Sequence, residues 1–249
     1  MITFVVVVVL IYLGLCAVLF LFQRSLIYFP HPRLLDTAPK ISLPVDKADI
    51  VITVRPHAGP YALIYFGGNA EDVSYSLPSL SAAFPEYGIY LAHYRGYGGS
   101  SGKPSEVALV ADALALFDQV QTSHKTIVVV GRSLGSGVAV QLASLRPVER
   151  LVLVTPYDSI QELAARQFPY FPVRWLLQDK FESWRYASQI TAPTLVLAAE
   201  QDEVIPRAST ESLFKQFRDG VAALKVVRGT SHNTISESPE YLLQLRGVP

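Results

Sequence analysis

Short apolar runs alternate with longer helix-like stretches through most of this sequence, and this alternation constrains the fold more than any other feature. Seven apolar runs are typical of buried strands, at residues 50–54, 61–66, 89–94, 127–130, 151–154, 194–198 and 224–227. Helix-like stretches lie between or after them, at residues 73–83, 105–121, 134–145, 207–217 and 239–245. Continuous apolar strands separated by helices predict an α/β fold with a mostly parallel central sheet and helices on both faces.

Composition indicates an ordered protein and excludes several classes. Hydrophobic residues make up 50% of the 249 positions and charged residues 17%, far from the polar, highly charged composition of disordered chains. The 21 basic residues balance the 21 acidic ones, so no basic face for nucleic acid is expected. The single cysteine, Cys16, excludes an intrachain disulfide and a multi-cysteine zinc site. No other metal-ligand spacing or cofactor motif is present, so neither a metal nor a cofactor is expected.

The N-terminal segment is predicted to be a membrane anchor. Residues 2–22 include no charged residue, and a helix of this length reaches roughly 31 Å, about the thickness of a bilayer's hydrocarbon core. A cleaved signal peptide is the main alternative, but no basic residue precedes the run and no small-residue cleavage site ends it. Bulky Leu15 before Cys16 argues against a lipoprotein site. We therefore expect an uncleaved single-pass transmembrane anchor at residues 1–23.

The rest of the chain is expected to form a single domain. A connector is predicted at residues 24–41 and one α/β domain at residues 42–249. Within the domain, residues 155–192 are the one long stretch between strands and are predicted to form a small lid. The nearest basic residues, Arg24 and Arg33, follow the anchor, and none precedes it. The positive-inside rule therefore places the domain on the cytoplasmic side of the membrane.

Ser133 is the candidate nucleophile. The pattern G-x-S-x-G, which marks a serine on a sharp strand-to-helix turn, occurs at residues 98–102 and 131–135. The second copy follows a predicted strand and precedes a helix rich in small residues. The first copy, around Ser100, lies in a Gly-rich loop with no helix behind it. The context therefore favours Ser133, and Ser100 is interpreted as an ordinary loop serine.

His232 is the candidate base. A serine nucleophile needs a base to accept its proton and a carboxylate to orient that base, and on this scaffold the order is serine, acid, histidine. Only His232 follows Ser133, since the other histidines all precede it. It comes directly after the last predicted strand, where the ligand-binding loops of an α/β sheet gather.

Four carboxylates compete for the role of the acid. Glu200, Asp202 and Glu203 follow the predicted strand at residues 194–198, and Asp158 follows the strand before it. We favour Asp202, because it lies just beyond the strand end and ahead of the next helix. The others are interpreted as solvated loop residues, with Asp158 a candidate helix cap.

Two backbone N–H groups are needed to stabilise the oxyanion that forms during such chemistry. One donor is expected from Leu134, the residue after the nucleophile. The other is expected from the Gly-rich turn after residues 61–66, where Asn69 is the preferred donor and Gly68 the alternative. A glycine turn without a catalytic role also fits this segment.

Taken together, these motifs resemble the α/β-hydrolase superfamily. They are most similar to its membrane-anchored serine hydrolases, which include depalmitoylase-type and lysophospholipase-like enzymes. The matching segments are residues 67–71, 94–98, 131–137, 201–206 and 231–233. The resemblance implies an α/β-hydrolase fold, a triad of Ser133, Asp202 and His232, and an oxyanion hole formed by Asn69 and Leu134.

Two features depart from the pattern of this superfamily. His93 stands where relatives usually carry Asp. Because that position lies outside the triad, we expect the change to affect loop packing. The N-terminal hairpin that usually precedes the oxyanion strand is reduced to residues 55–60, which leaves the first strands of the sheet undefined.

The predicted lid is rich in aromatic residues, namely Phe168, Tyr170, Phe171, Trp175, Phe181 and Trp184. Such residues suit an acyl-chain pocket or a membrane-facing lid, and they fit the core packing of two short helices equally well. With a transmembrane anchor that holds the site near lipid, the sequence favours hydrolysis of ester or thioester bonds in acyl or lipid-like substrates through an acyl-enzyme on Ser133. The alternatives are amide or peptide cleavage by the same triad and a non-catalytic membrane adaptor. Acyl-chain length and oligomeric state are left open.

Overall fold

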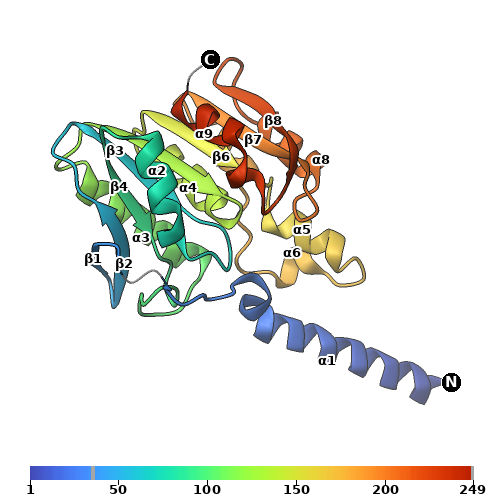
Figure 1. Ribbon diagram of the computed structural model, residues 1–249. Helices are drawn as coiled ribbons and strands as arrows, with labels where there is room; N and C mark the ends of the chain where they lie inside the picture. Colours follow the sequence, from blue (N-terminus) through green and yellow to red (C-terminus); the bar gives the residue numbers. More distant parts are fainter. Residues whose placement is uncertain (35–36, 248–249) are drawn as a thin grey trace.

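The computed structural model of the chain describes residues 1–34 and 37–247. Their central feature is an eight-stranded sheet with the order β1-β2-β4-β3-β5-β6-β7-β8 (Figure 1). The β1–β2 and β2–β4 pairs are antiparallel, and every other neighbouring pair is parallel. The strands are β1 (Lys40–Val45), β2 (Ala48–Arg55), β3 (Tyr61–Phe66), β4 (Tyr87–Ala92), β5 (Thr126–Arg132), β6 (Arg150–Val154), β7 (Thr194–Gln201) and β8 (Ala222–Ser231).

Helices cover both faces of this sheet, which confirms the predicted α/β architecture (Figure 1). On one face α2 (Leu77–Ala83) packs beside α9 (Pro239–Arg246), and on the other α3 (Glu106–Val120) packs beside α4 (Leu134–Leu145). The remaining helices are α1 (Ile2–Ile27), α5 (Ile160–Gln167), α6 (Val173–Leu176), α7 (Trp184–Ala187) and α8 (Arg207–Phe214), with short 3-10 turns at Val73–Ser76 and Ile235–Glu237.

Strand β5 shows why the buried strands appear in the sequence as continuous apolar runs. Val128 and Val130 belong to the apolar cluster beneath α2 and α9, whereas Ile127 and Val129 belong to the cluster beneath α3 and α4. Successive side chains of a strand point to opposite faces of the sheet, and both faces are covered here. Residues 127–131 are therefore all buried, and the alternation of apolar and polar residues that marks a half-exposed strand is absent.

The first edge of the sheet differs from the prediction. Residues 40 and 41 were expected in the connector and no strand before residue 50, but β1 begins at Lys40 and pairs along its length with β2. The connection turns at Asp46, whose φ of 53° is left-handed. Only Leu43 and Val45 are buried in this edge strand, which also includes Pro44. A strand with so few buried residues gives no apolar run, and Pro is tolerated at a sheet edge.

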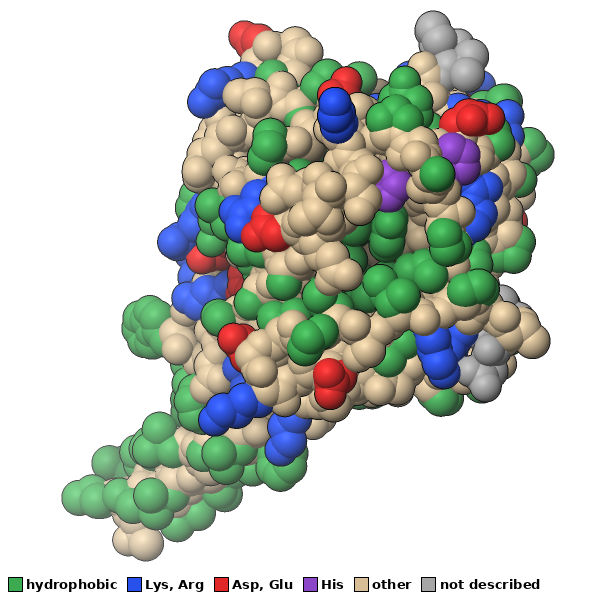
Figure 2. All heavy atoms as spheres, turned by 90° about the vertical axis from the view of Figure 1, so that its left-hand side faces the viewer, with side chains coloured by type: hydrophobic (Ala, Val, Ile, Leu, Met, Phe, Trp, Pro, Cys, Tyr) green, Lys and Arg blue, Asp and Glu red, His purple; other side chains and the backbone are tan. Residues whose placement is uncertain are grey.

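Helix α1 extends away from the rest of the molecule (Figure 1). It ends at Ile27, four residues beyond the predicted anchor boundary at residue 23. In Figure 2 the extended arm at the lower left carries mostly hydrophobic side chains. Among the described residues, α1 is the one helix long and apolar enough to cross a membrane. Positions 35 and 36 of the predicted connector and 248 and 249 of the predicted domain lie outside the described residues.

Candidate active site

Ser133 lies on the sharp turn between β5 and α4. Its backbone angles, φ 48° and ψ −117°, are rarely adopted by residues that carry a side chain. Two glycines make the turn possible by allowing close backbone approach. A Cβ on Gly135 would collide with the carbonyl oxygen of Phe66, and one on Gly131 would collide with the carbonyl oxygen of Gly135. The turn therefore presses α4 against the end of β3 and leaves Ser133 at its tip.

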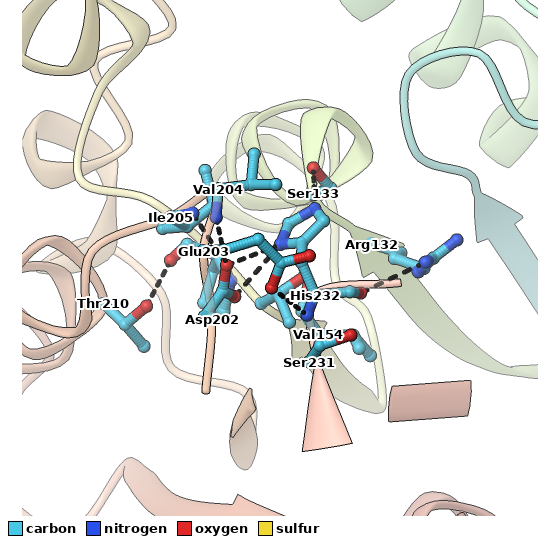
Figure 3. A network of polar contacts seen from close by, with 12 residues as sticks. Arg132, Ser133, Val154, Asp202, Glu203, Val204, Ile205, Thr210, Ser231 and His232 are labelled. Atoms are coloured by element: carbon cyan, nitrogen blue, oxygen red, sulfur yellow. Dashed lines mark hydrogen bonds and ion pairs between the residues drawn. The ribbon is translucent and has the colours of Figure 1, made fainter. Parts of the chain in front are cut away.

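Ser133, His232 and Asp202 form one chain of hydrogen bonds (Figure 3). The Nε2 atom of His232 lies 3.0 Å from the Oγ atom of Ser133. The Nδ1 atom of His232 lies 2.9 and 3.0 Å from the two carboxylate oxygens of Asp202. Ser133 directly follows the end of β5, Asp202 that of β7 and His232 that of β8. The structure thus brings together the three residues predicted from their order in the sequence.

The loop after β7 holds the carboxylate and the histidine in place (Figure 3). One oxygen of Asp202 accepts hydrogen bonds from the backbone N–H groups of Val204, at 3.0 Å, and Ile205, at 2.7 Å. The backbone N–H of His232 donates to the carboxylate of Glu203 at 3.2 Å. Glu203 is therefore more than the solvated loop residue that the sequence indicated, because it connects the two loops that carry Asp202 and His232.

Glu71 connects the turn after β3 to Arg132, the residue that precedes Ser133. One of its carboxylate oxygens accepts hydrogen bonds from the backbone N–H of Gly68, at 2.6 Å, and from Arg132, at 3.0 Å. The other oxygen accepts from the hydroxyl of Tyr65 at 2.8 Å. Arg132 also donates to the carbonyl of His232 at 3.3 Å. One largely buried ion pair therefore links the turn after β3, the nucleophile turn and the histidine loop.

The two candidate donors of the turn after β3 have different partners. The N–H of Gly68 is taken by Glu71. For the backbone N–H groups of Asn69 and Leu134, no acceptor is found among the described residues. Both residues line the same cavity as Ser133. The side chain of Asn69 binds the end of α1, since its Nδ2 atom donates to the carbonyl of Ile27 at 2.7 Å.

Ser100, in the first G-x-S-x-G, is a structural residue. Its buried hydroxyl donates to the carbonyl of His93 at 2.8 Å and accepts from the N–H of Val51 at 2.8 Å, which ties the Gly-rich loop to β2. His93 is buried too, and its Nε2 atom lies 2.9 Å from the hydroxyl of Thr53. A Cβ on Gly98 would collide with its ring. The His93 departure therefore concerns loop packing, as expected.

Asp158 is neither a solvated residue nor a helix cap, which corrects both expectations. The N-cap of α5 is Ser159, whose hydroxyl accepts from the N–H of Glu162 at 3.0 Å. Asp158 precedes the cap and is buried, and its carboxylate accepts from the hydroxyl of Ser209 on α8 at 2.6 Å. Its role is to join the start of the lid to α8, because the cap position belongs to the next residue.

A cavity of about 610 Å³ opens beside Ser133 and is lined mainly by apolar side chains. This volume lies within the usual range for small-molecule sites. Part of its wall comes from α5 and α6, which lie in the predicted lid segment, and part from the loop after β7. A further part comes from α1, through Leu19, Gln23, Leu26 and Ile27. Helix α1 therefore forms part of the cavity wall, beyond its predicted role as an anchor.

The lid segment contains three short helices, α5, α6 and α7, rather than two. Its aromatic residues have three different environments. Phe181 is buried in the core, Phe168 and Phe171 line the cavity, and Tyr170 and Trp175 are exposed at 85% and 88%. Core packing and pocket lining, which the sequence left as alternatives, therefore both occur.

Comparison with known proteins places this arrangement in a family. The model of the alpha/beta hydrolase family matches residues 64–189. An uncharacterized protein of Mycobacterium tuberculosis is 36% identical over 231 residues, covering 85% of this chain and 80% of that protein. The chain belongs to the alpha/beta hydrolase family. It is a hydrolase of the α/β-hydrolase fold, as the resemblance of its motifs implied.

Further relatives of this hydrolase have been described. An alpha/beta hydrolase domain-containing protein of Caenorhabditis elegans, aho-3, is 31% identical over 192 residues, or 75% of this chain and 56% of that protein. An esterase of Pyrococcus furiosus superposes with a TM-score of 0.71 at 17% identity, covering 88% of this chain and 97% of that one. Est1E of Butyrivibrio proteoclasticus, solved with ferulic acid bound, has a TM-score of 0.68 at 15% identity, covering 83% and 95%. At these identities the two structures show the shared fold.

Several site residues of this α/β hydrolase were not singled out from the sequence. Glu71 and Arg132 stand inside quoted motifs, but nothing in those motifs shows that they pair. Gln23 and Tyr12 are polar residues within the apolar α1, and they were a signal that one face of this helix contacts protein. Within residues 1–34 and 37–247, no group of three His, Cys, Asp or Glu side chains is arranged to hold a metal ion.

Proposed function

We propose that this α/β hydrolase is a membrane-anchored serine hydrolase that cleaves ester or thioester bonds of acyl or lipid-like substrates. The observation that carries the proposal is the Ser133–His232–Asp202 chain of hydrogen bonds beside an apolar cavity. A hydroxyl, an imidazole and a carboxylate at these distances are the groups required for nucleophilic acyl transfer. The apolar walls offer an acyl chain a dry environment next to the nucleophile.

In the first half-reaction, the Oγ atom of Ser133 attacks the substrate carbonyl carbon while Nε2 of His232 accepts the hydroxyl proton. The bond from that carbon to the leaving oxygen or sulfur then breaks, and the imidazolium returns its proton to the departing alcohol or thiol. Asp202 accepts the Nδ1–H throughout, so it holds the required tautomer and stabilises the imidazolium. The products are an acyl ester of Ser133 and a free alcohol or thiol.

In the second half-reaction, water takes the place of the leaving group. His232 accepts a proton from the water as its oxygen attacks the acyl carbon, and it then returns the proton to Ser133 when the acyl-enzyme bond breaks. A carboxylic acid leaves and the free enzyme is restored. Both tetrahedral intermediates carry an oxyanion, for which we assign the backbone N–H groups of Asn69 and Leu134 as donors. Neither group has another acceptor among the described residues.

We assign α1 as an anchor that is retained in the mature protein. A signal peptide is removed, so nothing in the folded domain is expected to depend on it. Here the side chain of Asn69 binds the carbonyl of Ile27, and Arg24 pairs with the buried Asp179 at 2.9 Å. These contacts support a helix that stays attached. The cytoplasmic orientation and the narrower depalmitoylase-type or lysophospholipase-like branch stay predictions.

The proposal is tested by steady-state kinetics on the full-length protein in detergent. Matched p-nitrophenyl esters, thioesters and anilides are compared for the wild type, Ser133→Ala and Ser188→Ala, which changes an exposed serine after α7. We expect the wild type and Ser188→Ala to cleave esters and thioesters, with kcat reduced at least about 1000-fold in Ser133→Ala. A preference for anilides would instead identify an amidase or peptidase. A folded wild type with no turnover would support the adaptor.

A further inference from the structure

Helix α1 presents one regularly spaced face to the rest of the molecule. The positions are Tyr12, Cys16, Leu19, Gln23 and Leu26, which are four, three, four and three residues apart. This spacing places them on a single stripe of the helix. Cys16 and Gln23 are buried, whereas most other α1 side chains are exposed. The polar residues Tyr12, Cys16 and Gln23 thus all lie on the face that contacts the domain.

The contacts of this face are specific. The side chain of Gln23 donates to the carbonyl of Leu176 at 3.2 Å and accepts from the N–H of Gln178 at 2.7 Å. Asp179, which is almost fully buried, accepts from Arg24 at 2.9 Å and from the hydroxyl of Tyr28 at 3.2 Å. Hydrogen bonds between buried groups require one relative position of helix and lid. Helix α1 and the end of the lid are therefore held in register.

The lid extends along α1 well beyond this attachment. The hydroxyl of Tyr12 donates to the carbonyl of Tyr170 at 2.9 Å, and its ring stacks on Phe171 with 5.7 Å between centroids. Tyr12 lies about 16 Å along the helix from Gln23 at 1.5 Å per residue. If α1 crosses a membrane, the tip of the lid lies beside it at the depth of the acyl chains. The exposed rings of Tyr170 and Trp175 suit contact with lipid.

The cavity beside Ser133 lies between these two elements. Leu19, Gln23, Leu26 and Ile27 of α1 form one side of it, and residues of α5 and α6 form another. The end of α1 is fixed to the turn beside the nucleophile, because Asn69 binds both the carbonyl of Ile27, at 2.7 Å, and the N–H of Phe29, at 3.0 Å. The anchor therefore contributes to the acyl pocket as well as to attachment.

We propose that α1 is a wall of the acyl pocket and that the substrate enters from the bilayer, between α1 and the lid. This inference rests on the proposed function and specifies its substrate as a long-chain ester or thioester lipid in the leaflet that surrounds the lid. The acyl chain lies along the cavity-lining residues Leu19, Leu26 and Ile27 of α1, with its carbonyl carbon at Ser133. A substrate that left the leaflet would expose its acyl chain to water, whereas a substrate that enters beside α1 keeps its acyl chain in an apolar environment throughout.

A photoreactive inhibitor tests this arrangement directly. The probe is a long-chain alkyl fluorophosphonate with a diazirine at the chain end, added to the full-length protein in lipid nanodiscs. Reaction at Ser133 places the chain in the pocket, and irradiation then cross-links its end to whatever lies beside it. We expect cross-linked peptides from α1, within residues 12–27. Reaction at Ser133 with cross-links to the lid or β7 loop alone would overturn the inference, and no reaction at Ser133 would overturn the proposed function itself.

A matched pair of variants provides an independent readout. Leu19→Trp adds bulk to the wall of the pocket, whereas Leu21→Trp adds the same bulk on a face of α1 that is 73% exposed and outside the cavity. We expect Leu19→Trp to lower the ratio of long-chain to acetyl ester kcat/KM at least 10-fold. Leu21→Trp is expected to leave that ratio within 2-fold of the wild type. Equal ratios for the two variants would contradict a pocket wall formed by α1.

Discussion

The carboxylate of Glu71 and the guanidinium of Arg132 lie 3.0 Å apart, and this ion pair joins the turn after β3 to the residue before Ser133. Both side chains are largely buried, at 14% and 13% exposure. The same carboxylate oxygen holds the N–H of Gly68. Glu71 therefore fixes the position of the neighbouring Asn69, whose N–H we assign to the oxyanion hole, and acts as a positioning residue.

Glu71→Gln is expected to lower kcat about 10- to 100-fold with little change in KM, because small displacements of an oxyanion donor weaken transition-state binding most. The substitution keeps the shape of the side chain but removes the charge that faces Arg132. Glu86→Gln is the matched control, since the Glu86 side chain is 77% exposed. Steady-state kinetics together with thermal unfolding would make the test. Equal kcat values for the two variants would show that Glu71 has no positioning role.

Asp202 and Asp158, the two aspartates that competed for the triad, are expected to respond in opposite ways to substitution by asparagine. Asp202→Asn places a hydrogen-bond donor or a neutral acceptor opposite Nδ1 of His232, so kcat is expected to fall about 10³- to 10⁴-fold with the fold intact. Asp158→Asn weakens the contact with Ser209. It is expected to lower the free energy of unfolding by about 1–2 kcal/mol while kcat stays near the wild-type value. The reverse pattern would assign the acid to Asp158.

His93 is expected to make the fold sensitive to acid. Burial lowers its pKa from 6.5 to about 4, with Asp72 opposing this shift and Arg33 adding to it. Between pH 6.5 and pH 4 the unfolded chain binds the proton more readily than the folded chain does. The contribution of neutral His93 to the free energy of unfolding is therefore complete above pH 6.5 and is lost as the pH falls toward 4. The loss at pH 5 is about 2 kcal/mol relative to pH 7.

This pH dependence is measured as the midpoint of thermal unfolding in detergent at pH 7 and pH 5. The midpoint of the wild type is expected to fall between these values, and that of His93→Gln is expected to fall less. His57→Gln serves as the control, because the His57 side chain is 32% exposed. Identical shifts for the wild type and His93→Gln would show that other groups determine the acid sensitivity.

The sheet could be predicted from the sequence wherever strands are buried on both faces. Residues 61–66 match β3 at both ends, because every residue from Ala62 to Phe66 is buried and the run is continuous. Strand β1 could not be found this way. It lies at the edge, buries only Leu43 and Val45, and depends on pairing with β2 for its conformation. Pairing with a distant partner leaves no local pattern of apolar residues.

The triad candidates could be predicted because the scaffold fixes their order along the chain, and Ser133, Asp202 and His232 follow strands that end at one edge of the sheet. The Glu71–Arg132 pair could not, since charged residues 61 positions apart have no periodicity that links them. The docking of α1 was missed for a different reason. A continuous apolar run satisfies the criterion for a membrane span, and that criterion ignores which face of the helix carries its few polar residues, Tyr12, Cys16 and Gln23.

Labelling with a fluorophosphonate probe tests the central claim, an activated serine at Ser133, most directly. The full-length protein in detergent is labelled beside Ser133→Ala, Ser188→Ala and Ser100→Ala, and the modified peptide is identified by mass spectrometry. The account predicts labelling at Ser133 in the wild type, Ser188→Ala and Ser100→Ala, and none in Ser133→Ala. Labelling that persists in Ser133→Ala, or a folded wild type that does not react, would contradict the account.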